Sequence, residues 1–218
     1  MNMRRRHKAP ERVRGETMTA NLEAGAITDA SAGKRARHLP GAEGVWVFVY
    51  ADMAVFALMF GCFMWDRHQA PELFETSRLA LSLNFGGINT LILLTSSMLV
   101  VLGVDALKFG RVHLAPGFFG SAAACGAAFI VSKILEYGHK FDAGIGLTTN
   151  AFFQYYFIMT GLHLGHVAVG TIIIAVLAAK SRAERPGCSV AVYEGGATYW
   201  HMVDLLWVAI FPLLYLVR

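Results

Sequence analysis

Seven ionisable side chains stand within stretches of this sequence that are otherwise strongly apolar. A charged group at the centre of a bilayer costs about 2.5–3.5 kcal/mol on insertion scales, so such a residue needs a partner or a function there. Carboxylate and imidazole groups also bind and release protons, and imidazole binds metals. The candidates for chemistry are therefore Asp52, Lys133, Glu136, His163, His166, His201 and Asp204.

The spacing of these residues groups them further. His163 and His166 are three positions apart, and so are His201 and Asp204. Residues three apart in a helix lie on the same side of it. At about 1.5 Å of rise per residue, Asp52, His166 and His201 all come to lie about 9–12 Å from the cytoplasmic edge of the membrane. The sequence therefore predicts that these three side chains share one layer.

Two roles remain open for the histidines and aspartates. The first is a hydrogen-bonded lock between two helices, which satisfies buried polar groups and fixes the packing. The second is a haem b site with His166 and His201 as axial ligands, one from each of two facing helices. A haem absorption band that disappears on His201→Ala would identify the second role.

The roles of the remaining ionisable residues, Asp52 and the pair of Lys133 and Glu136, are considered separately. Asp52 stands alone in an apolar run with no partner on its own helix. It either takes part in proton handling or hydrogen-bonds a neighbouring helix. Lys133 and Glu136 are three apart near the outer end of their helix, where we expect them to neutralise each other.

These residues must be positioned by membrane-spanning helices. Of the 218 residues, 56% are hydrophobic and only 16% are charged, which excludes an ordinary soluble domain. A spanning helix needs about 20 apolar residues. We therefore predict an all-α polytopic membrane protein, a bundle of five transmembrane helices. A transporter would favour an internal repeat, and none is found. The predicted spans are 44–65, 85–107, 117–139, 151–179 and 195–217.

The distribution of charge predicts orientation and domain organisation. Residues 1–43 hold nine Lys and Arg against five Asp and Glu, and basic residues favour the cytoplasmic side. The N-terminus is therefore predicted to lie inside and the C-terminus outside. Residues 1–40 are expected to form a disordered basic cytoplasmic tail, unless Met18 is the true start, and residues 41–218 the transmembrane domain.

Small residues and a proline predict how two of the helices pack. Gly161 and Gly165 are four apart, the spacing at which two helices cross closely. Pro212 lies within the last span and is expected to kink it near its end.

The order of four motifs resembles subunit III of the haem-copper oxidase superfamily. The motifs are NTLILLTSSM at 89–98, EY at 136–137, TGLHLGHVAVGT at 160–171 and YWHMVDLLW at 199–207. The last two are the most specific, because the family typically reads T-G-x-H-x-x-H-x-x-x-G and W-H-x-V-D-x-x-W there. The signature positions carried over are His163, His166, Gly170, Trp200, His201, Asp204 and Trp207.

The resemblance implies a non-catalytic accessory subunit with no haem or copper of its own, in the bacterial cytoplasmic (inner) membrane. It would pack against a catalytic subunit that reduces oxygen or nitric oxide, bind structural phospholipid and support proton uptake. No nucleic acid is implied as a partner. Asp52 stands where the family usually has a Glu, and five helices replace the seven of many members. These departures favour the branch associated with nitric oxide reductase.

Overall fold

The computed structural model describes residues 43–183 and 190–217, and every element in this part of the chain is helical. The tail predicted at residues 1–40 lies outside the described residues. The elements, in chain order, are α2 (Glu43–Gln69), α3 (Pro71–Leu79), α4 (Leu83–Lys108), α5 (Ala115–Asp142), α6 (Ala151–Ala183), α7 (Val190–Phe211) and the π-helix η1 (Pro212–Leu216).

Five of these helices are long and apolar enough to cross a membrane, with mean hydropathies between 1.4 and 2.0 over their best windows. The prediction of an all-α protein with five spans is confirmed, and each span contains the central part of its predicted range. The orientation of the termini stays a prediction.

The connector between α2 and α4 contains the short helix α3, which lies between two predicted spans and was itself not predicted. Pro71 occupies the first turn of α3, Glu72 lies in the same turn and Arg78 in the last. Proline is preorganised for a first helical turn, and this order of charges complements the helix dipole. These local signals are present in the sequence, but the segment has low hydropathy and so does not stand out in a search for membrane spans.

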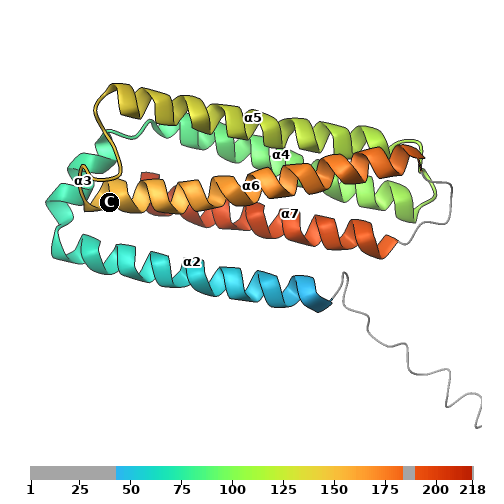
Figure 1. Ribbon diagram of the computed structural model, residues 1–218, viewed down its shortest axis with the longest axis horizontal. Coiled ribbons are helices and arrows are strands. Elements are labelled where there is room, and N and C mark those ends of the chain that lie inside the picture. Colours follow the sequence, from blue (N-terminus) through green and yellow to red (C-terminus); the bar gives the residue numbers. More distant parts are fainter. Residues whose placement is uncertain (1–42, 184–189, 218) are drawn as a thin grey trace, which may run out of the picture. The chain divides into compact units, whose positions relative to one another are not determined.

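Four of the spans form a closed arrangement, and α2 lies beside it. Helices α4, α5, α6 and α7 each pack against two neighbours, in the order α4–α5–α6–α7 and back to α4. Among the spans, helix α2 packs mainly against α6 and α7 (Figure 1). Its best window is 11% buried, whereas that of α7 is 56% buried. The interior of the described protein therefore centres on α7.

The close approach between helices occurs at glycines other than the predicted pair. A methyl group on Gly170 of α6 would lie 2.7 Å from the Trp200 ring of α7, and one on Gly126 of α5 would lie 2.9 Å from the same ring. Gly165 has nothing within 4 Å and Gly161 has only the Tyr137 hydroxyl, at 3.9 Å. The tight crossing predicted at Gly161 and Gly165 is therefore wrong, because four-residue spacing does not reveal which way the glycines face.

The break predicted at Pro212 takes the form of the π-helix η1. Proline has no backbone N–H, so it cannot continue the hydrogen-bond pattern of α7. The N–H of Val217 instead donates to the carbonyl of Pro212, at 2.9 Å, across the wider π turn. The rings of Phe211 and Tyr215 then lie over Gly86 of α4, where any larger residue would clash.

Candidate functional site

The most deeply buried polar cluster is centred on an ion pair within α5. Lys133 Nζ lies 2.8 Å from Glu136 Oε2, and the two side chains are 0% and 4% exposed. This contact confirms the neutralisation predicted from their spacing. A buried ion pair is stable only when hydrogen bonds satisfy its remaining donors and acceptors.

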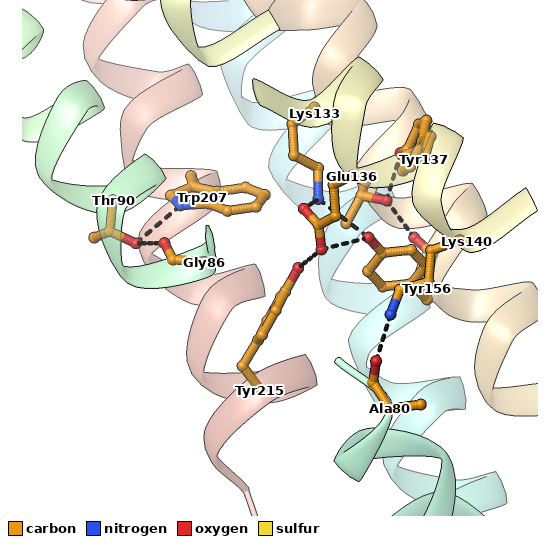
Figure 2. Close-up of polar contacts among 11 residues, drawn as sticks. Ala80, Gly86, Thr90, Lys133, Glu136, Tyr137, Lys140, Tyr156, Trp207 and Tyr215 are labelled. Atoms are coloured by element: carbon orange, nitrogen blue, oxygen red, sulfur yellow. Dashed lines mark hydrogen bonds and ion pairs between the residues drawn. The ribbon is translucent and has the colours of Figure 1, made fainter. Parts of the chain in front are cut away.

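Two tyrosines supply the hydrogen bonds that the carboxylate needs. The hydroxyls of Tyr156 on α6 and Tyr215 on η1 donate to Glu136 Oε1, at 2.8 and 2.7 Å. Lys133 Nζ also donates to the Tyr156 hydroxyl, at 3.3 Å. The pair thus ties α5 to α6 and to the segment that follows α7 (Figure 2).

Aromatic rings surround the ammonium group of Lys133. Its Nζ lies 5.4 Å from the ring centre of Tyr137, 5.1 Å from that of Tyr156 and 5.2 Å from that of Trp207. Aromatic faces attract cations at such distances. Trp207 is itself fixed by a 3.0 Å hydrogen bond from its indole N–H to the Thr90 hydroxyl of α4. All the helices of the closed arrangement therefore contribute to this cluster.

His163 adjoins the same cluster through the indole ring of Trp207. Its imidazole stacks on Trp207 with ring centres 5.2 Å apart, and the edge of Phe129 meets it at 5.6 Å. The side chain is fully buried, and neither ring nitrogen has a hydrogen-bond partner in the described part of the chain. His163 acts there as an aromatic packing residue.

A second cluster joins α2 to α6. Asp52 Oδ1 lies 3.1 Å from His166 Nε2, and His166 Nδ1 lies 2.9 Å from the carbonyl of Leu162. The carbonyl only accepts, so Nδ1 carries a hydrogen, and Nε2 is the nitrogen that faces the carboxyl. Asp52 therefore does have a partner, on another helix.

His163 and His166 contact different neighbours despite their three-residue spacing. His163 packs against α5 and α7, whereas His166 faces α2. The prediction that they lie on the same side of their helix therefore does not give them the same neighbours. The boundary between the two faces of α6 falls between these residues.

His201 and Asp204 form a third polar region, where α7 meets α4. His201 Nδ1 lies 2.7 Å from the Ser97 hydroxyl. Asp204 is buried, and neither of its oxygens has a hydrogen-bond partner among the described residues. His201 thus contacts α4 while His166 contacts α2, so the predicted layer brings Asp52 and His166 together without His201.

The haem alternative does not fit this arrangement. An axial ligand needs a free ring nitrogen, and both nitrogens of His166 are engaged, by Asp52 and by Leu162. His166 and His201 also bond to opposite neighbours, α2 and α4. Across residues 43–183 and 190–217, no three His, Cys, Asp or Glu side chains are grouped so as to hold a metal ion.

The observation that decides the family is a match along nearly the whole helical part of the chain. The family model described as cytochrome c oxidase subunit III matches residues 40–217, which include all five spans. The chain belongs to the cytochrome c oxidase subunit III family.

Curated members of the subunit III family share about a third of the sequence. Cytochrome c oxidase subunit 3 of Synechocystis is 32% identical over 177 residues, covering 79% of this chain and 74% of the relative. Quinol oxidase subunit 3 of Bacillus subtilis is 28% identical over 181 residues, covering 79% of this chain and 85% of the relative. Haem-copper oxidase subunit I+III of Aeropyrum pernix is 29% identical over 182 residues, covering 79% of this chain and 22% of the relative.

Within this subunit III fold, the sequence motifs pointed to most of the buried polar residues but missed their partners. Tyr156 and Tyr215, which complete the Glu136 site, were not singled out, and neither was Arg78, which binds the carbonyl of Tyr215 at 3.1 Å. The available signal was chemical: a buried carboxylate requires donors, and tyrosines in apolar spans can supply them.

Proposed function

We propose that this chain is the non-catalytic third subunit of a haem-copper respiratory oxidase, lying in the bacterial cytoplasmic membrane with its N-terminus inside. The observation that carries the proposal is how the family's signature residues are used. Trp200 and Trp207 pack in the interior, and His163 and His166 bond or stack with protein groups. Such residues build a scaffold, so the redox chemistry belongs to a partner.

The catalytic haem-copper subunit is the proposed partner. The Aeropyrum relative carries subunits I and III in one chain by its name, and this chain aligns with 22% of it. A fused relative supports the association of separate subunits. The relatives reported above are named as oxidases, which supports oxygen as the gas reduced. Nitric oxide reduction, favoured by Asp52 and the five-helix form, stays a prediction.

Lipid binding is proposed for the outward faces of α2. Its large apolar side chains are exposed, since Leu58 and Trp65 are about 70% accessible. Hydrocarbon or a partner helix must cover such residues in a membrane, because water does not stabilise them there. Phospholipid chains beside α2 would also reinforce the few contacts that hold it.

Support of proton uptake is proposed for Asp52, whose carboxylate lies 3.1 Å from the His166 imidazole. We expect Asp52→Asn to slow turnover of the assembled oxidase several-fold, because an amide cannot take up or release a proton as a carboxyl does. Oxygen consumption by the purified complex measures the effect. Asp66→Asn is the matched control, since Asp66 lies on the same helix and accepts a 2.7 Å hydrogen bond from Tyr155. Unchanged turnover in a normally assembled Asp52→Asn complex would contradict the proton role.

The accessory role itself is tested by co-purification. The tagged chain, solubilised from its own membranes in mild detergent, is expected to bring with it a larger haem-bearing subunit. Mass spectrometry identifies that partner, and a reduced-minus-oxidised spectrum reports its haem. Recovery of the chain without any haem protein from membranes that contain active oxidase would count against the proposal.

A further inference from the structure

The three donors to Glu136 differ in how firmly the fold holds them. Lys133 and Tyr156 lie within the long helices α5 and α6, whereas Tyr215 lies in the five-residue π-helix η1. π-Helical turns are rare and often occur at functional sites. Tyr215 is therefore the donor whose position depends on a short segment.

Arg78 of α3 fixes the backbone of this segment. Its Nη1 donates to the carbonyl of Tyr215 at 3.1 Å. Its Nη2 and Nε donate to the two oxygens of Glu75, at 2.6 and 3.2 Å. The hydrogen bond to Glu75 raises the pKa of the Arg78 guanidinium, so this side chain stays charged at any working pH. One arginine thus links α3 to the residue that caps Glu136.

Helix α3 is connected in turn to the bundle by two further hydrogen bonds. Lys140 of α5 donates to the carbonyl of Ala80, directly after α3, as drawn in Figure 2. The amide of Asn150, just before α6, donates to the Ser77 hydroxyl at 2.9 Å. The contacts of α3 therefore reach η1, α5 and the start of α6 at one end of the bundle.

We propose that α3 and η1 act together as a strap that closes the Lys133 and Glu136 ion pair against water at this end of the bundle. Tyr215 is the seal, and Arg78 is the residue that positions it. When the strap opens, the Tyr215 hydroxyl leaves Glu136 Oε1 and water takes its place, because a buried carboxylate oxygen needs a donor. The inference depends on this chain alone and not on its proposed partner.

The polar side chains of the strap are more exposed to water than the ion pair that the strap covers. The side chains of Arg78 and Glu75 are 17% and 41% exposed, and ion pairs in contact with water contribute little to stability. The ion pair beneath is almost completely buried. Short segments can open locally at a smaller free energy than global unfolding, and opening of this one has to expose the buried side chains of Phe74 and Leu214. Opening of the strap therefore does not require the spans to separate.

Acylation of Lys133 by a water-soluble N-hydroxysulfosuccinimide ester tests the strap in the full-length chain in detergent. Mass spectrometry of the peptide that contains Lys133 gives the rate. We expect very slow labelling of the native chain. In the Arg78→Gln variant, Lys133 should be acylated about tenfold faster, because the substitution removes a charged hydrogen bond within the strap. Tyr215→Phe removes only the sealing hydroxyl and should also accelerate labelling.

Two references separate strap opening from general loosening. Lys108 lies at the far end of α4 and is about half exposed, so its acylation rate should be the same in all variants. Arg111→Gln, a change of the same kind at an exposed residue just after the far end of α4, should leave Lys133 as slow as in the native chain. The proposal is overturned if Tyr215→Phe leaves Lys133 at its native rate, or if Arg111→Gln accelerates it as much as Arg78→Gln. If Arg78→Gln fails to fold, Tyr215→Phe alone decides.

Discussion

Replacing Glu136 with alanine is expected to lower the free energy of unfolding by about 3–5 kcal/mol, the usual cost of breaking a buried ion pair. The variant leaves the ammonium of Lys133 fully buried without a counter-ion, and it removes the acceptor of both tyrosine hydroxyls. Titration of the purified chain with a denaturing detergent, followed by circular dichroism, measures the loss.

The control for this prediction removes both charges together. In Lys133→Met with Glu136→Gln, the glutamine carbonyl still accepts from the tyrosines and no charge is left unpaired. We expect this double variant to recover more than half of the stability lost in Glu136→Ala, because neutral replacement of a buried pair is often harmless. A double variant as unstable as Glu136→Ala would show that the charges themselves stabilise the fold.

Gly170→Leu is expected to prevent native packing of α6 on α7, with a loss of at least about 3 kcal/mol, at the upper end of the cost of overpacking. Even a methyl group at Gly170 would lie 2.7 Å from the Trp200 ring and 3.2 Å from that of Tyr199. Trp200 is fully buried and its ring also lies close to Gly126, so it has little room to move away. The same denaturation experiment measures the effect.

Gly165→Leu is the matched control, since it makes the same change on the same helix five residues earlier. Nothing lies within 4 Å of Gly165, so the isolated chain should retain its stability. Equal losses in the two variants would mean that helix propensity, and not contact with Trp200, determines the result.

Much of the fold was predictable because hydropathy alone marks membrane spans. Each span satisfies the length that a bilayer demands, and this requirement acts on a continuous stretch of sequence. Helix α3 was missed because its signals are a first-turn proline and a charge order, which hydropathy does not register. The glycine pair at 161 and 165 led to a wrong prediction, because the spacing shows that the two residues share one side of a helix but not which helix packs against that side.

The candidate sites were predictable only in part for a related reason. The Lys133 and Glu136 contact is local, three residues apart, and follows from helix geometry. Tyr156 and Tyr215 lie 20 and 79 residues from Glu136, and no sequence spacing connects them. The depth argument succeeded for Asp52 and His166 and failed for His201, because equal depth does not bring two residues to the same helix interface.

The absorption spectrum of the purified chain, recorded alone and with its co-purified partner, tests the central claim most directly. The account predicts haem bands in the complex and none in the chain after it is separated from the partner in detergent. His166→Ala and His201→Ala should leave the haem content per catalytic subunit unchanged. A Soret band that stays with the isolated, folded chain and disappears on His201→Ala would contradict the account.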